Sequence, residues 1–99
     1  MIDLDFSFSA ELWKWSGGNW HFVTVPSEVS ADIRSFTRHD YKGFGSVRVR
    51  VRVGKSEWLT SVFPDKKSRC YFLPIKAAIR KTEKLNIGDL ADVQLNILI

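Results

Sequence analysis

The sequence predicts a mainly β domain with two short α-helices, in the order β β α β β β α β, that curls into a small barrel. Apolar and polar residues alternate in several stretches, glycine-containing turns separate these stretches, and two short segments space apolar residues three and four apart. We expect one domain, residues 1–99. A hydrophobic content of 44% and a charged content of 26% exclude a disordered chain or a coiled coil.

The first part of the chain predicts a hairpin and a helix. Residues 4–14 alternate as a half-buried strand does, residues 16–19 (SGGN) form a turn, and residues 20–25 read as the returning strand. Apolar side chains spaced four and three apart then predict an amphipathic helix over residues 28–37. The glycine-containing stretch 38–45 is expected to be a loop.

The clearest pattern is SVRVRVRV, residues 46–53, in which valines occupy one face of a strand and arginines the other. Gly54-Lys55 places glycine first in a two-residue loop, as a type II′ hairpin requires. This turn sets the register, because a slip of one residue would bring arginines onto the valine face. The expected pairs include Val51 with Trp58, Arg52 with Glu57, and Arg48 with Ser61.

The last third predicts a strand, a helix and a strand. Residues 70–73 form a short strand, and Pro74 suits the first turn of the helix that follows. Asn86 or Gly88 ends that helix, and residues 91–99 alternate as the final strand.

The net charge of +4 is unevenly distributed. Residues 1–40 hold 3 basic and 6 acidic side chains, residues 41–84 hold 12 and 3, and residues 85–99 hold none and 2. The sums are −3, +9 and −2, so the positive charge belongs to the middle of the chain.

Several classes of protein are excluded by the same counts. No apolar run approaches the roughly 20 residues of a membrane span, and Asp3 and Asp5 stand where a signal peptide is basic, so we expect a cytoplasmic protein with no membrane contact. One cysteine, Cys70, and two histidines are too few for a disulfide or a closed zinc site. We expect no cofactor and no metal.

A signature of aromatic, hydroxyl, proline and charged residues spans several of the expected elements. It consists of Trp58, Thr60, Ser61, Phe63, Pro64, Tyr71, Leu73, Pro74, Lys76, Arg80, Gly88 and Asp89. With this signature, residues 43–89 and the opening hairpin, residues 8–26, resemble the bacterial and archaeal family known as domain of unknown function 1905. The resemblance implies a small double-split β-barrel and assigns no activity. Relatives often continue into a helical module of the bacteriocin-protection type, and we expect this chain to lack that module.

One position departs from the family. The resemblance implies a glycine two residues before Tyr71, where this chain has Arg69. If the loop needs a positive φ there, Arg69 is strained.

The leading candidate site combines Arg48, Ser61, Tyr71, Lys76 and Arg80. The arginines and the lysine attract an anion, the hydroxyls are neutral donors, and the first turn of the helix adds free backbone N–H groups. If the helix docks on the strand pair, these groups line a cleft for a small anionic molecule or an acidic peptide end. The alternative is that Lys76 and Arg80 are solvated helix residues.

Two other interpretations use different residues. Arg48, Arg50 and Arg52 on one strand face suggest a dimer that binds nucleic acid, or else a solvated charged face, because no aromatic residues alternate with them. Trp13 or Trp15 is expected either to pack in the core or at its rim, or to be exposed at a ligand cleft or a protein interface, such as a dimer contact. No spacing of nucleophile, histidine and carboxylate indicates an enzyme.

Overall fold

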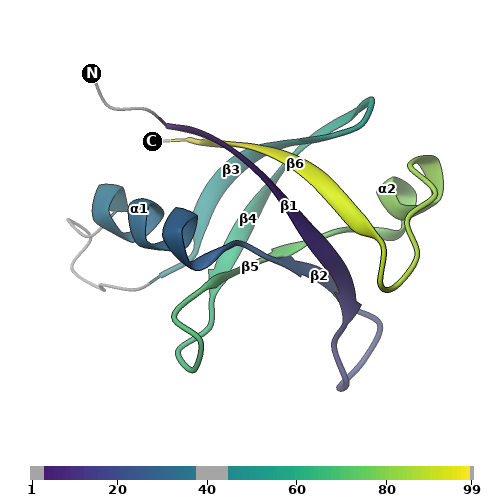
Figure 1. Ribbon diagram of the computed structural model, residues 1–99, viewed down its shortest axis with the longest axis horizontal. Helices are drawn as coiled ribbons and strands as arrows, with labels where there is room; N and C mark the ends of the chain where they lie inside the picture. Colours follow the sequence, from purple (N-terminus) through teal and green to yellow (C-terminus); the bar gives the residue numbers. More distant parts are fainter. Residues whose placement is uncertain (1–3, 38–44, 99) are drawn as a thin grey trace.

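The computed structural model describes residues 4–37 and 45–98 and shows a closed antiparallel barrel with two short helices (Figure 1). The expected loop at residues 38–45 lies outside the described residues except for Gly45. Within the described ranges, no helix is long and apolar enough to cross a membrane. The mainly β fold class predicted from the sequence is confirmed.

The elements follow one another in the predicted order. The chain forms β1 (Asp5–Lys14), β2 (His21–Thr24), α1 (Ser27–Thr37), β3 (Val47–Val53), β4 (Ser56–Pro64), β5 (Tyr71–Pro74), α2 (Ala77–Thr82) and β6 (Leu90–Ile97).

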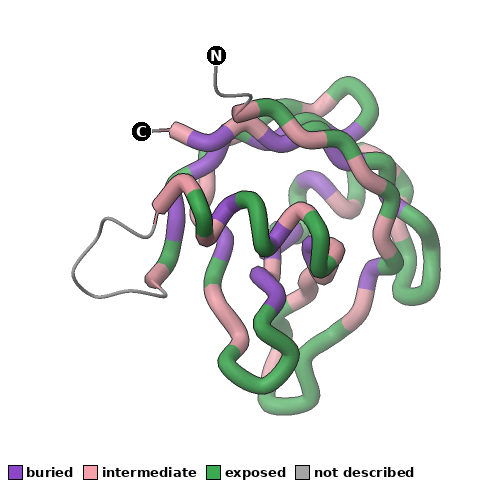
Figure 2. Tube along the Cα trace, turned by 60° about the vertical axis from the view of Figure 1, so that its left-hand side comes forward, coloured by how far each residue is buried: buried purple, intermediate pink, exposed green. Residues whose placement is uncertain are grey.

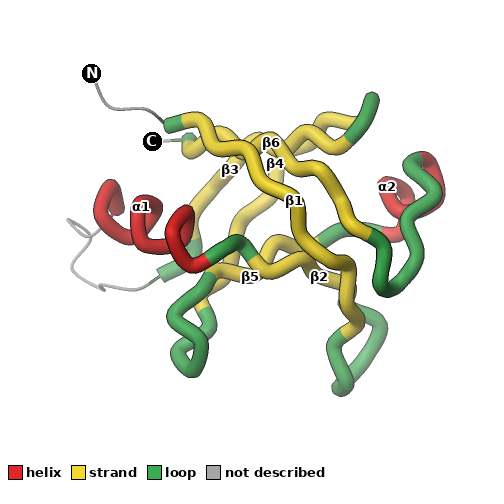
Figure 3. The backbone as a smooth tube through the Cα atoms, viewed as in Figure 1, coloured by secondary structure: helices red, strands yellow, loops and turns green. Residues whose placement is uncertain are grey.

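The strands close in the order β1-β2-β5-β4-β3-β6, with every neighbouring pair antiparallel (Figure 3). The two long strands, β1 and β4, each pair with one neighbour in one sheet and another neighbour in a second sheet. β4 therefore joins the two sheets, and its outer face is continuous with the outer faces of β3 and β5.

The β3-β4 hairpin has the predicted register. Val51 pairs with Trp58 and Arg48 with Ser61. Gly54 has φ +59°, and Lys55 is not among the positive-φ residues, which fits a type II′ turn and excludes type I′.

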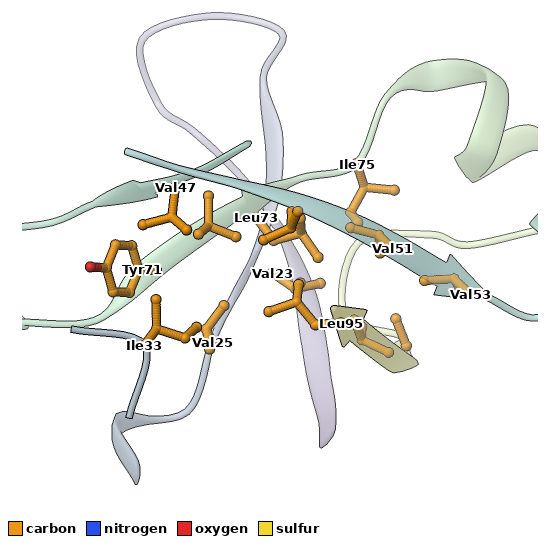
Figure 4. Close-up of a cluster of buried hydrophobic side chains, with 14 of the residues drawn as sticks. Val23, Val25, Ile33, Val47, Val51, Val53, Tyr71, Leu73, Ile75 and Leu95 are labelled. Carbon is orange, nitrogen blue, oxygen red and sulfur yellow. The ribbon is translucent and has the colours of Figure 1, made fainter. Parts of the chain in front are cut away.

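Alternation along the strands builds the core inside the barrel. All four valines of β3 are buried and its three arginines are exposed. The buried tube segments of Figure 2 alternate with exposed ones in the same way, and Figure 4 shows side chains from several strands meeting inside. The helices lie on opposite sides of the barrel (Figure 1) and add Ile33 from α1 and Ile79 from α2 to the core.

A buried serine fastens α1 to the barrel. Ser30 Oγ donates to the Val25 carbonyl at 3.0 Å and accepts from the Tyr71 N–H at 3.0 Å. The helix is thereby bonded to the end of β2 and the start of β5.

The predicted boundaries of α2 are wrong at both ends. Pro74 does not begin the helix but pairs with Phe22 as the last residue of β5, because strand pairing continues to this point and beyond it to the Ile75 N–H, which donates to His21. The helix ends at Thr82, where Lys84 turns to φ +55° and the Leu85 N–H closes on the Arg80 carbonyl.

The loop between β4 and β5 does require a positive φ. Arg69 has φ +65°, a left-handed conformation that favours glycine over residues with a side chain. The expected strain at this position is therefore present in the structure.

Candidate functional site

The five residues of the predicted anion cleft do not come together. Tyr71 is fully buried, and Figure 4 shows it inside the barrel near Val47 and Ile33. Burial raises the pKa of its hydroxyl, and a hydrogen bond with Thr37 and the charge of Arg34 oppose that rise. Tyr71 is therefore part of the core, and the prediction that it lines a surface cleft is wrong.

Arg48 and Ser61 are cross-strand partners, as predicted, but neither lines the hollow that Lys76 borders. Arg48 is six residues from Gly54, about 20 Å along an extended strand. The end of α2 packs at the other end of this hairpin, where Ser56 Oγ donates to Glu83 at 2.6 Å. Arg48 and Lys76 thus do not line one shared cleft.

Lys76 and Arg80 instead lie beside the histidine that begins β2. Arg80 donates from Nε to the Ile75 carbonyl at 3.1 Å, and its guanidinium lies 3.4 Å from His21 Nε2. His21 Nδ1 lies 2.8 Å from the Asn19 carbonyl and must donate to it, which leaves Nε2 as the acceptor toward Arg80. Lys76 is exposed.

His21 and Lys76 border a small hollow, here called the basic corner, and Arg80 contacts its wall through His21 and Ile75. It measures about 230 Å³ and is lined by Asn19, Trp20, His21, Pro74, Ile75 and Lys76.

A second hollow adjoins the basic corner and is lined by aromatic rings alone. This aromatic hollow measures about 350 Å³, and Trp20 belongs to both hollows. Trp15, Trp20 and Phe63 are 48%, 57% and 43% exposed, which is unusual for such large apolar side chains. Its lining residues are Trp15, Trp20, Phe22, Phe63 and Phe72.

The barrel topology explains why these rings gather. The partner of Phe22 in β5 is Pro74, Thr24 pairs with Phe72, and Phe72 pairs with Phe63, so three adjacent strands point rings outward at one level. The ring centroids of Phe22 and Phe72 are 5.7 Å apart.

Trp13 and Trp15, the two predicted rim residues, have different roles. Trp13 is half-buried, donates from Nε1 to Thr24 at 3.0 Å, and packs edge-on against Phe72 at 4.9 Å. It supports the hollow from one side. Trp15 lines the hollow, and its indole lies so close to Gly17 that a Cβ there would stand 2.5 Å from Trp15 Cη2.

Sequence reasoning missed the three phenylalanines of the hollow. The predicted hairpin register did place Phe63 on the outer face with the arginines, and an exposed phenylalanine on that face was the available signal. Phe22 and Phe72 could not be placed, because the pairing of β2 with β5 joins segments that are far apart in sequence.

Arg50 and Arg52 of β3 border two polar grooves on the sheet formed by β1, β6, β3 and β4. One groove of about 600 Å³ includes Arg52 and Asp92, and one of about 310 Å³ includes Arg50, Arg52, Asp5 and Glu57. Carboxylates thus share these grooves with two of the three arginines, and Arg48 lines neither.

Within residues 4–37 and 45–98, no three histidine, cysteine, aspartate or glutamate side chains lie close enough together to hold a metal ion.

Comparison with known proteins identifies one family. The model of the family described as "Domain of unknown function (DUF1905)" matches residues 8–95, which is most of the chain. No curated protein matches the sequence.

Proposed function

The chain belongs to the family described as domain of unknown function DUF1905, and on this premise we propose that it is a binding domain for a small aromatic anion. The ligand's ring lies in the aromatic hollow and its anionic group lies at the basic corner. One observation carries the proposal: Trp20 lines both hollows, so one molecule can contact both.

The aromatic hollow supplies most of the affinity. Offset or edge-on contacts with a planar ligand contribute about 0.5–1.5 kcal/mol per ring in addition to burial of apolar area. Trp20 already lies nearly parallel to Phe22, with planes 11° apart, and the other side of an indole that is 57% exposed is open to a ligand.

The basic corner supplies the preference for an anion. Lys76 is exposed and brings a flexible ammonium group, whereas Arg80 is held by Ile75 and His21 and has a fixed position. An acidic peptide end, the other ligand considered from the sequence, would use this corner and leave the rings uncovered. The aromatic hollow therefore favours a ligand with a ring.

Two dyes that differ in charge test the proposal. Anilinonaphthalene sulfonate is an aromatic anion, and N-phenyl-naphthylamine is its uncharged counterpart. We expect the sulfonate to bind more tightly. Lys76→Gln should weaken only the sulfonate, by about fivefold, because one exposed charge contributes up to about 1 kcal/mol. Phe63→Ala should weaken both dyes about tenfold.

Matched controls keep this test specific. Leu59→Ala removes an exposed apolar side chain of the same strand outside the hollow, and Lys55→Gln removes an exposed charge at the hairpin turn. Neither should alter dye binding. If Leu59→Ala weakens the dyes as much as Phe63→Ala does, the aromatic hollow is not the binding site.

A further inference from the structure

The aromatic hollow continues into a cationic surface across β4. Phe63 and Ser61 lie two residues apart on the same outer face of this strand, about 7 Å from each other. Phe63 pairs with Phe72 on one side, and Ser61 pairs with Arg48 on the other. A ligand that leaves the hollow past Phe63 therefore meets Arg48.

Cations flank the hollow on both sides. Lys76 borders the adjoining basic corner, and Arg48 is exposed on β3. Lys76 follows the end of β5, and Arg48 lies on β3, two strands away in the order β5-β4-β3, so these two strands are about 10 Å apart at 4.8 Å per step. Lys66 and Lys67, both exposed in the loop after Phe63, add further positive charge.

This surface coincides with the basic segment of the chain. Residues 41–84, with 12 basic and 3 acidic side chains, contain β3, β4, β5 and α2. Of the three acidic residues, Asp65 accepts hydrogen bonds from both the backbone N–H and the hydroxyl of Ser68.

We propose that the aromatic anion is a nucleotide unit within a single strand of nucleic acid, whose bases stack on the rings of the hollow and whose phosphates contact Lys76 on one side and Arg48 on the other. Aromatic platforms combined with a cationic path are what such strands require, and a base has a flat face for each ring. This inference rests on the proposed function, since the same hollow receives the ring.

The arginine row by itself is a weaker candidate. Arg50 and Arg52 share a groove with Asp5 and Glu57, so phosphates there would face carboxylates. Arg48 lines neither polar groove and is the arginine whose partner, Ser61, lies next to Phe63 on the outer face. A duplex is also a poor fit, because its bases are already stacked and offer no faces to the rings.

Fluorescence anisotropy with three labelled probes tests this occupant. The probes are an oligothymidylate of about eight nucleotides, within the range of about 4–16 that small barrels cover, an abasic strand of equal length, and a duplex of equal length. We expect the oligothymidylate to bind at least about tenfold more tightly than either comparator, since stacking supplies the difference. Equal affinity for the abasic strand, or no binding, overturns the inference.

Two arginines of one strand provide matched variants. Arg48→Gln should weaken the oligothymidylate several-fold and reduce the slope of log affinity against log salt by about 0.7, the value for one phosphate contact on a single strand. Arg52→Gln removes the same charge from the same face and should change binding less than twofold. Equal effects of the two variants would contradict the assigned path.

Dye binding separates this inference from the proposed function. Arg48→Gln should leave binding of anilinonaphthalene sulfonate unchanged, because the dye does not reach beyond the hollow. If the dye binds at the hollow and the oligothymidylate binds no better than thymidine monophosphate, the nucleic-acid inference fails and the proposed function stands. If an oligoglutamate peptide displaces the strand at equal charge, the partner is an acidic peptide and the inference also fails.

Discussion

The indole of Trp20 lies almost parallel to the ring of Phe22, with centroids 5.9 Å and planes 11° apart. This pair joins the turn after β1 to the outer face of β2 and forms one wall of the aromatic hollow. Large rings that pack against one another on the outside of a barrel are only partly buried. A ligand that covers their exposed faces can bury the remaining apolar area.

Gly17 is expected to control the shape of the hollow. A methyl group at this position meets Trp15 Cη2 at 2.5 Å, so Gly17→Ala must displace the indole. We expect affinity for anilinonaphthalene sulfonate to fall several-fold while the melting temperature changes little, because Trp15 is 48% exposed. Gly18→Ala is the control, since its Cβ lies 3.6 Å from the nearest indole atom, an ordinary contact. Equal dye affinity in the two variants would show that Trp15 does not shape the site.

Ser30 is expected to contribute strongly to stability. Ser30→Ala leaves the Tyr71 N–H without its 3.0 Å acceptor and the Val25 carbonyl without its 3.0 Å donor, both buried. The free energy of unfolding should fall by about 2–3 kcal/mol in urea denaturation. Ser35→Ala, on the exposed side of the same helix, should change it by less than about 0.5 kcal/mol. A loss at Ser30 no larger than that at Ser35 would rule out this role.

The backbone conformation at position 84 should favour glycine over the native lysine. Its φ of +55° follows the end of α2, a position that favours glycine. We expect Lys84→Gly to stabilise the protein by about 0.5–1 kcal/mol. Lys81→Gly removes the same charge inside the helix and should destabilise it by about 1 kcal/mol. Thermal unfolding of the two variants checks the opposite signs, and the same sign for both would contradict the conformation assigned to Lys84.

Tyr71 should make stability decline at alkaline pH. Burial raises the pKa of its hydroxyl above the ordinary value of 10.0. Below that value the tyrosine is neutral in both states, and its contribution is complete. As the pH rises further, the unfolded chain releases the proton before the folded chain does, so the free energy of unfolding falls until the folded pKa is passed.

Tyr71→Phe removes this dependence from position 71. Urea denaturation between about pH 8 and pH 11 should show a smaller decline for the variant than for the natural chain. Parallel declines would mean that Tyr71 titrates normally and is not shielded from water.

The sequence predicted those parts of the fold that depend on local pattern. The alternation of valine and arginine and the two-residue turn at Gly54 sufficed for the β3-β4 register, because any slip exposes valines and buries arginines. The boundaries of α2 were not predictable, since Pro74 suits both a first helical turn and the end of a strand.

The candidate site was predictable only in part. Lys76 and Arg80 were recognised as a cationic pair, but Tyr71 was assigned to the surface because a four-residue strand shows too little alternation to indicate its inner face. The aromatic hollow depends on β2, β5 and β4 lying side by side, and the β2-β5 pairing crosses about half of the chain. No local pattern contains that pairing.

Ligands are expected to bind at the aromatic hollow and the basic corner. This location can be checked by nuclear magnetic resonance of the four tryptophan indole N–H groups during titration with anilinonaphthalene sulfonate. We expect large shifts for Trp15 and Trp20, with Trp58, packed against the core, unchanged. Largest shifts among the backbone amides of Arg50, Arg52 and Gln94, with Trp15 and Trp20 unmoved, would contradict it.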